Sequence, residues 1–253
     1  MWFDTHLHLD PEDRPALLFA AARAVGVDGF LIAGTGLDDS RRAASTAAQE
    51  HGVVAAAGVH PHEARLSLDL EAFRALLAEP RVVAVGEIGL DYYYNHSPAA
   101  DQRRVFAAFL ELAAALGRPV IVHCRDAFDD CLAMLSEAAA DGVRVLIHSF
   151  TGTPDQATRA LEFGAMLSFN GMVTFNRAEN IRAALAVVPV SRLLLETDSP
   201  YLAPVPYRGE RNTPARVVEV GRRVAAEKGL AEADLARLTT ANARRFFGLA
   251  DPG

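Results

Sequence analysis

Short apolar runs alternate with alanine- and leucine-rich amphipathic stretches along the whole chain, and this alternation restricts the possible folds most strongly. The eight runs read WFDTHLH, GFLIAGT, VVAAAGVH, VVAVGEIG, PVIVHC, VRVLIHS, AMLSFNG and RLLLETD. Continuous apolar runs of this length, bounded by turns, are typical of strands buried on both faces of a parallel sheet. Because a helix or a long loop follows each run, the sequence predicts eight consecutive β-α units.

The amphipathic stretches indicate helices at residues 14–25, 40–50, 102–116, 126–140, 154–163, 214–228 and 232–247. Eight β-α units in 253 residues favour a closed TIM-type (β/α)8 barrel, an α/β fold that needs about 250 residues, over an open doubly wound sheet. No glycine-rich dinucleotide or phosphate loop follows the first run. No linker interrupts the pattern, so we expect one domain over residues 1–253.

Composition narrows the classes of function. A formal net charge of −7 argues against a general basic surface for nucleic acid, so any phosphate must meet local arginines or bound cations. The chain lacks a signal-peptide pattern and an apolar run of the ~18 residues that a membrane helix needs. Its two cysteines, Cys124 and Cys131, offer no disulfide framework. We therefore expect a cytoplasmic protein without membrane contact, whose oligomeric state stays open and for which a monomer is plausible.

Histidines and carboxylates stand at the ends of six of the eight runs: His6, His8, His60, His62, Glu87, His123, His148 and Asp198. The active sites of such barrels form at these carboxyl ends. Only His51 and His96 fall elsewhere, at expected surface positions. Any single one of these residues is ordinarily a satisfied polar group, but the repetition of ligand-type residues favours a metal site. A metal also supplies the partner that buried imidazoles and carboxylates require.

The number of strong ligands predicts two divalent ions rather than one. The six are His6, His8, Glu87, His123, His148 and Asp198. They exceed the needs of one tetrahedral ion with an open position, and they suit two neighbouring ions. Glu87 has two oxygens and can bridge them. A carbamylated lysine cannot bridge here, because the only lysine, Lys228, lies in a late helix.

Seven motifs carry a resemblance to a known family. DTHLHLD, GVHPH, GEIGLDYYY, PVIVHCRDA, HSFTG, FNGMVTF and LLLETDSPYLAP, the last followed by RGERNTP, resemble the TatD family of metal-dependent deoxyribonucleases, in order from residue 3 to about 247. The resemblance implies an amidohydrolase-like barrel that hydrolyses nucleic-acid phosphodiesters, often as a 3′-5′ exonuclease on single strands. Single-stranded DNA is therefore the expected substrate. Cys124 and Ser149 stand reversed relative to the usual family pattern, without affecting the ligands.

The resemblance also distributes the ligands. It implies that one ion is held by His6, His8, Glu87 and Asp198, and the other by Glu87, His123 and His148. Asp198 is the expected residue to orient or deprotonate the attacking water, with Glu87 as the second catalytic carboxylate. Magnesium, manganese and zinc all remain open, since the donors suit zinc or manganese while phosphodiester chemistry often uses magnesium.

Further residues are expected to contact the substrate. We assign His60, His62, Tyr92, Arg125, Arg208, Arg211 and Asn212 to this role. The arginines suit forked hydrogen bonds to phosphate, and the tyrosines of YYYN and SPYLAPVPY suit stacking on bases or packing within their loops. His60 has the alternative of shaping its turn. Asn212 has the alternative of capping the following helix.

Two other functions compete with the nuclease. A hydrolase of a small ester, amide or phosphate ester can use the same barrel and metals, since fold and metals do not dictate the substrate. An open mouth lined by arginine and tyrosine favours a polymer end, whereas an enclosed apolar pocket favours a small ester. A non-catalytic scaffold predicts that ligands have been lost, yet every one is present.

Overall fold

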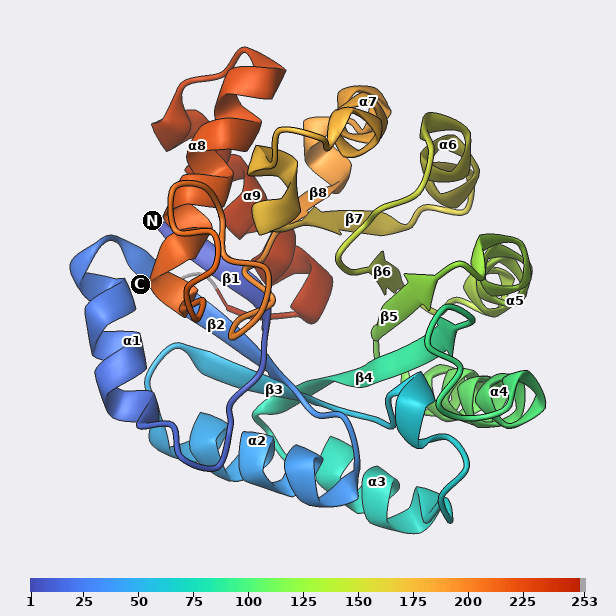
Figure 1. The fold of residues 1–253 in the computed structure, drawn as a ribbon. Helices are drawn as coiled ribbons and strands as arrows, with labels where there is room; N and C mark the ends of the chain where they lie inside the picture. Colours follow the sequence, from blue (N-terminus) through green and yellow to red (C-terminus); the bar gives the residue numbers. More distant parts are fainter. Residues whose placement is uncertain (251–253) are drawn as a thin grey trace.

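Eight strands form one parallel sheet in sequence order within residues 1–250, the part of the chain that this computed structural model describes (Figure 1). The strands are β1 (Trp2–Leu7), β2 (Val27–Ala33), β3 (Val53–Ala57), β4 (Val82–Asp91), β5 (Val120–Arg125), β6 (Val145–Ile147), β7 (Met166–Phe169) and β8 (Leu193–Leu195). A parallel bridge between Leu7 and Ser199 joins the last strand to the first. The predicted TIM-type (β/α)8 fold is confirmed. Residues 251–253 of the predicted domain lie outside the described residues.

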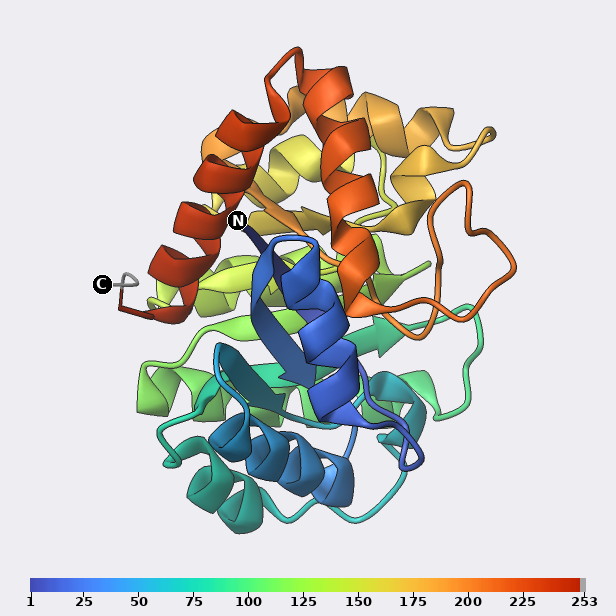
Figure 2. The same cartoon turned by 90° about the vertical axis from the view of Figure 1, so that its left-hand side faces the viewer.

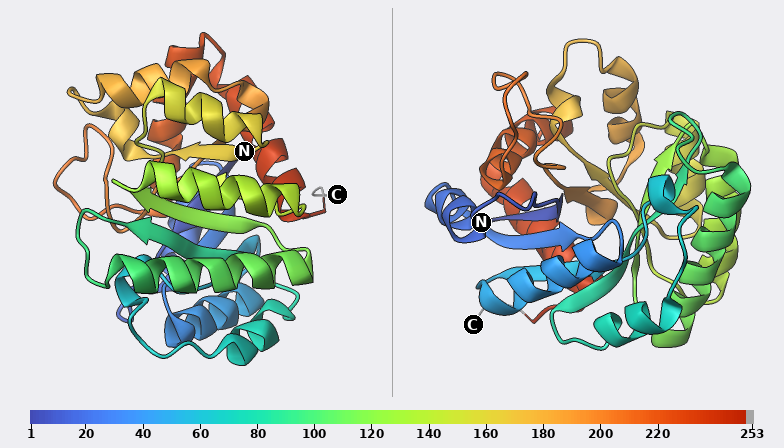
Figure 3. Two further views of the ribbon diagram at one scale, coloured as in Figure 1. Left: turned by 90° about the vertical axis from the view of Figure 1, so that its right-hand side faces the viewer. Right: turned by 60° about the horizontal axis from the view of Figure 1, so that its bottom comes forward.

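Helices follow the strands in the alternation that the sequence predicts. They are α1 (Pro15–Ala24), α2 (Leu37–Gln49), α3 (Leu70–Leu77), α4 (Ala99–Leu116), α5 (Phe128–Ala140), α6 (Pro154–Glu162), α7 (Glu179–Val187), α8 (Val217–Lys228) and α9 (Glu232–Phe247). The sequence patterns had indicated no helix for α3 and α7, which are among the shortest. The predicted helix at 126–140 begins later, because Asp126 has a left-handed φ of 52°. Figure 3 shows α4, α5 and α6 packed side by side outside the sheet.

The amino-terminal end of the barrel is closed by α9. Inward-facing side chains from the strands form a cluster with Phe246 and Phe247 of this helix, and the rings of Phe3 and Phe247 stack at 6.3 Å. Figure 1, viewed toward the opposite end, shows α9 passing behind the strands. The ARRFF segment therefore docks the last helix, which leaves only the carboxyl end of the barrel open for a site.

Loops at the carboxyl end frame that opening. The loops after β4 and β8 project on the same side of the molecule (Figures 2 and 3). They carry all five tyrosines, of which Tyr93, Tyr94 and Tyr201 are at least half exposed. No helix within residues 1–250 is both long and apolar enough to cross a membrane.

Candidate metal centre

Closure of the barrel places Asp198 beside the two histidines of β1. The backbone N–H of Asp198 donates to the carbonyl of His6 (2.9 Å), and the N–H of His8 donates to the carbonyl of Ser199 (2.7 Å). These bonds bring Asp198 Oδ1 to 3.6 Å from His8 Nε2 and 3.9 Å from His6 Nε2. Residues almost two hundred positions apart thus share one corner of the opening.

Glu87 lies at the middle of the site and divides its two oxygens between different histidines. Its Oε2 lies 3.2 Å from His6 Nε2 and 3.4 Å from His8 Nε2. Its Oε1 lies 3.1 Å from His123 Nδ1 and 2.8 Å from His148 Nε2. The six predicted ligands therefore converge, and they form two groups that share one carboxylate.

Close packing of β4 against β5 makes this convergence possible. Gly89 pairs with His123 in the sheet, and a Cβ at position 89 would lie only 2.0 Å from the carbonyl oxygen of His123. Gly89 also has a φ of 140°, which side-chain-bearing residues rarely adopt. Glycine at this position therefore allows His123 to approach Glu87.

Two buried imidazole nitrogens in this cluster make no aligned hydrogen bond. Among residues 1–250 these are His6 Nδ1 and His148 Nε2, the latter at 2.8 Å from Glu87 Oε1. His8 Nδ1 donates to the carbonyl of Ala33 (3.1 Å), so its Nε2 carries the lone pair and faces His6 Nε2 at 3.1 Å. Unpaired buried acceptors of this kind are rare in proteins, and a cation between them would satisfy them. The residues therefore fit divalent metal ions.

Burial and neighbouring charges shift the pKa values of the side chains in this cluster in different directions. Burial acts to raise the pKa of Glu87, but the surrounding imidazoles, His148 foremost, hold it well below its usual range. Burial lowers the pKa of His6 to about 4, which leaves a neutral imidazole at physiological pH. Burial raises the pKa of Asp198 to about 7. Burial acts to lower the pKa of His123 and of His148, but the carboxylates beside them raise it above the usual value. These two imidazoles therefore hold protons that a divalent ion would displace on binding.

His60 lies next to this cluster in a different role. It forms a group of metal-ligand type with Glu87 and His123. Its Nδ1, however, accepts a hydrogen bond from the backbone N–H of His62 (3.2 Å), so its proton sits on Nε2. That Nε2 lies 3.5 Å from Glu87 Oε1, and burial lowers the pKa of His60 well below its usual value. His60 therefore presents a neutral N–H donor to the site.

Two buried carboxylates behind the histidines were missed by the sequence analysis. Asp91 Oδ2 lies 3.0 Å from Nε2 of both His62 and His123. Glu196 Oε1 accepts from the backbone N–H of Ser149 (2.8 Å) and lies 3.4 Å from His148 Nδ1. A signal was present, since Asp91 stands four positions after Glu87 and Glu196 two before Asp198. Even spacing places Glu87 and Asp91 on one face of β4. Glu196 directly follows the short strand β8.

Two of the arginines predicted to bind phosphate are engaged elsewhere. Arg211 donates to Asp10 (2.7 Å) and Asp13 (2.9 Å), which joins the loop after β8 to the loop after β1. The guanidinium of Arg208 lies over the ring of Phe175 at 4.1 Å from its centre. Opposite charges already neutralise Arg211, so the structure does not present it as a free phosphate contact.

Asn212 makes its hydrogen bonds within the loop after β8, and it does not cap the helix that follows. Its side chain is buried and its Nδ2 donates to the carbonyls of Thr197 (2.9 Å) and Tyr201 (2.7 Å). Its Oδ1 accepts from the adjacent N–H of Thr213, and the short 3₁₀ helix that follows begins without a side-chain cap. Asn212 therefore fixes the segment that carries Asp198.

Aromatic rings and Arg125 gather at one side of the mouth. The guanidinium of Arg125 lies 4.1 Å from the ring centre of Tyr93 and 4.6 Å from that of Tyr94. His62 faces this group, and the ring of His96 lies 4.6 Å from that of His62. His96 is exposed, as expected, but it belongs to the rim of the site. It lies beyond the end of β4, as expected, and the loop that carries it brings it beside His62.

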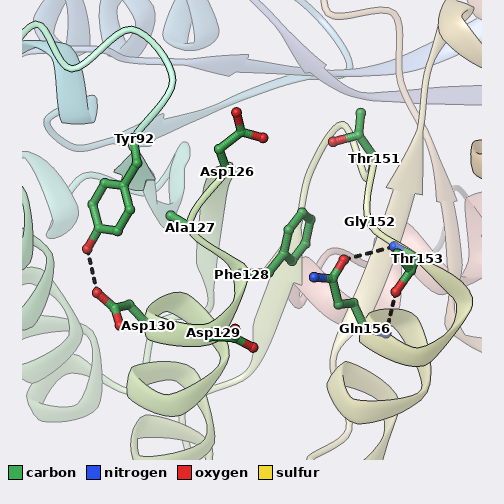
Figure 4. A pocket seen from close by; sticks show the side chains of 10 residues that line it. All are labelled: Tyr92, Asp126, Ala127, Phe128, Asp129, Asp130, Thr151, Gly152, Thr153 and Gln156. Atoms are coloured by element: carbon green, nitrogen blue, oxygen red, sulfur yellow. Dashed lines mark hydrogen bonds between the residues drawn. The ribbon is translucent and has the colours of Figure 1, made fainter.

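Tyr92 points away from this group into a separate groove. Its hydroxyl donates to Asp130 (2.7 Å), as Figure 4 shows. The groove has a volume of about 510 Å³ and lies between the starts of α5 and α6. None of the six predicted ligands lines it, and its wall includes Asp126 and Asp129. Carboxylates repel phosphate, so the groove does not extend the predicted phosphate site.

Imidazoles and carboxylates gathered at the carboxyl end of a (β/α)8 barrel are typical of metal-dependent hydrolases. Comparison with known proteins specifies the class further. A family model described as TatD related DNase matches residues 3–248. The chain therefore belongs to the TatD family, and it is a metal-dependent hydrolase of that family.

Individual relatives agree with this assignment along nearly their whole lengths. The uncharacterized metal-dependent hydrolase YcfH of Escherichia coli K12 is 41% identical over 250 residues, 96% of this chain and 94% of that protein. The 3′-5′ ssDNA/RNA exonuclease TatD of Cronobacter turicensis is 42% identical over 242 residues, 93% and 92% of the two chains. The crystal structure of YjjV, a TatD homolog from E. coli K12, superposes with a TM-score of 0.92 at 26% identity and covers 98% of both chains.

Proposed function

We propose that this protein is a two-metal phosphodiester hydrolase that acts on DNA, as a 3′-5′ exonuclease on single strands. The division of Glu87 between two groups of histidines is the observation that carries the proposal, since two adjacent ions suit in-line displacement at phosphorus. The similarity to a named 3′-5′ ssDNA/RNA exonuclease supports the choice of substrate and direction.

The residues of the site have different roles in such a reaction. His6, His8, Asp198 and Oε2 of Glu87 would hold one ion, and Oε1 of Glu87 with His123 and His148 the other. When bound, the ions supply Lewis-acid activation of water and neutralise charge on the phosphoryl oxygens.

Asp198 would act as the base of this reaction, and His60 as a hydrogen-bond donor. The side chain of Asp198 is 13% exposed, and its carboxylate accepts no hydrogen bond from the described chain, so it is free to take the proton of the attacking water. His60 Nε2–H donates toward the same space and suits a phosphoryl oxygen. One base and one hydrogen-bond donor thus face the position of the scissile phosphate.

The exposed side chains at the mouth of the barrel favour a flexible, single-stranded polymer as the substrate. Tyr93, Tyr94 and Tyr201 are 58%, 50% and 59% exposed, and exposed rings stack on bases irrespective of sequence. Arg125 holds a positive charge over two of these rings, within reach of a backbone that passes the metal centre. Double-stranded DNA keeps its bases stacked internally and offers no such contact.

The test is digestion of single-stranded DNA labelled at its 5′ end, after chelation and reconstitution with magnesium or manganese. We expect a metal-dependent ladder that shortens from the 3′ end, and a loss of about 10²–10⁴-fold in rate for Asp198→Asn, which removes the base while keeping its shape. Asp126→Asn, on the separate groove, is the matched control and should retain full activity.

Other outcomes would change the assignment. A reconstituted enzyme that leaves DNA intact but hydrolyses a small phosphate ester or an amide keeps the metal centre and removes the nucleic-acid substrate. Shortening from the 5′ end would retain the nuclease and reverse its direction.

A further inference from the structure

Asp91 is a buried carboxylate that accepts four hydrogen bonds and is absent from the predicted ligand set. Its Oδ2 accepts from Nε2 of His62 and of His123, both at 3.0 Å. Its Oδ1 accepts from the backbone N–H groups of Tyr93 (3.0 Å) and Tyr94 (2.8 Å). One oxygen thus faces the histidines and the other holds the turn that carries the exposed tyrosines.

The position of Asp91 is fixed from behind by Gln102 of α4. The side chain of Gln102 is buried, its Oε1 accepts from the backbone N–H of Asp91 (2.8 Å), and its Nε2 donates to the carbonyl of Asp91 (3.0 Å). The same Nε2 also donates to the carbonyl of Ser97 (2.8 Å). Since both backbone groups of Asp91 are bound, its carboxylate has one available orientation.

This geometry determines where the protons of two imidazoles lie. An ionised carboxylate only accepts hydrogen bonds, so His62 and His123 both carry a proton on Nε2. The lone pair of a neutral His123 is then on Nδ1, and this atom lies 3.1 Å from Glu87 Oε1, itself an acceptor. Two acceptors that face each other at this distance are bridged by a proton in the metal-free protein, and a divalent ion would take its place.

We propose that Asp91 is a positioning residue that fixes His123 in its metal-binding tautomer and ties this ligand to the tyrosine-bearing turn. Carboxylates that bind the second nitrogen of a metal-ligating histidine orient the ring and raise its basicity. Through Oδ1 the same residue sets the start of the Tyr93–Tyr94 segment. The proposal rests on the two-ion centre described above.

The variant Asp91→Asn separates the two roles of Asp91, which are the hydrogen bonds to the imidazoles and those to the tyrosine-bearing turn. The Oδ1 of asparagine still accepts from the N–H groups of Tyr93 and Tyr94, whereas its NH₂ group cannot accept from the imidazoles. His123 is then expected to move its proton to Nδ1, where it blocks the ion. Calorimetric titration of the chelator-treated protein with manganese should show one of two binding events weakened about 10–100-fold and the other unchanged.

Asp130→Asn is the matched control, because this exposed carboxylate binds the hydroxyl of Tyr92 near the same loop without touching a histidine ring. Both of its binding events should equal those of the wild type. The tautomers are read independently from ¹⁵N chemical shifts of the imidazoles, with Nε2–H for His123 in the wild type and Nδ1–H in Asp91→Asn.

The outcomes distinguish this proposal from the function on which it rests. A wild-type protein that binds fewer than two ions refutes the two-metal centre. Two ions in the wild type with unchanged affinities in Asp91→Asn overturn the role of Asp91 alone. Should the variant not fold, the wild-type spectrum decides, since an Nδ1–H tautomer for His123 contradicts the proposal.

Discussion

At the scale of single residues, one backbone hydrogen bond distinguishes a donor from a ligand. His60 Nε2 lies 3.5 Å from Glu87, close to the 3.4 Å of the predicted ligand His8, but the N–H of His62 occupies its Nδ1. The proton on Nε2 then makes His60 a donor that is neutral at physiological pH. A fixed neutral donor stabilises charge that develops on a substrate oxygen without reorganisation during the reaction.

His60→Ala should therefore keep both ions and lose activity. We expect two manganese ions per chain by metal analysis, and a rate of DNA hydrolysis reduced about 10²–10³-fold, the usual effect of losing one such donor. His51→Ala, which removes an exposed histidine far from the opening, is the control and should match the wild type. Loss of one ion in His60→Ala would instead identify His60 as a ligand.

At the scale of elements, the only lysine of the chain joins two helices. Lys228, at the end of α8, donates from Nζ to the carbonyls of Leu185 (2.6 Å), Ala186 (3.2 Å) and Val188 (2.6 Å) at the end of α7. The last carbonyls of a helix point out of its end, although that of Leu185 also accepts from the backbone N–H of Val188 (3.1 Å). The negative end of the helix dipole favours a cation at this place. The contact stabilises the packing of α8 on the barrel, outside the site.

Replacing Lys228 by methionine should destabilise the fold while leaving the chemistry intact. We expect the free energy of unfolding to fall by about 1–3 kcal/mol, because half-buried carbonyls lose a charged donor. Urea denaturation measures this difference. Arg237→Met, which removes an exposed pair with Asp234 at 3.3 Å, should change stability by at most about 1 kcal/mol. Equal effects of the two variants would contradict the capping role.

At the scale of the whole molecule, the predicted ions join strands from all sides of the barrel. Their ligands come from β1, β4, β5 and β6 and from the segment after β8, where the sheet closes through a single bridge. Ions bound only by the folded chain stabilise it, by about 2.7 kcal/mol when their concentration is 100 times the dissociation constant.

Removing the metal should therefore lower the melting temperature. For a chain of this length, about 2.7 kcal/mol corresponds to a fall of roughly 5–10 °C. Differential scanning calorimetry with and without chelator measures the change, and the melting temperature should rise with manganese concentration. Glu87→Gln, which cannot bridge two ions as a carboxylate, should show a smaller rise. A melting temperature independent of metal in the wild type would refute this link between site and fold.

The sequence by itself determined the barrel and the end of it where the predicted ligands gather. Apolar runs and amphipathic stretches are local patterns, and eight runs with seven amphipathic stretches leave few arrangements that bury them all. The carboxyl ends of parallel strands meet at one end of a barrel, so the ligand-type residues from His6 to Asp198 had to converge there. Asp91 and Glu196 stand at the same carboxyl ends, at the end of β4 and directly after β8.

Only the tertiary structure decided the hydrogen-bond partners. Arg211 pairs with Asp10 and Asp13 because barrel closure brings the loop after β8 against the loop after β1. The side chain of Asn212 donates to the carbonyls of Thr197 and Tyr201. The local sequence NTP does not show that these carbonyls lie near it. Such contacts join residues that are distant along the chain. They form only where the conformations of the loops bring the two side chains within a few ångströms of each other. The periodicity of apolar residues specifies on which face of a strand or helix a side chain lies. It carries no information about which atom of another element that side chain will contact.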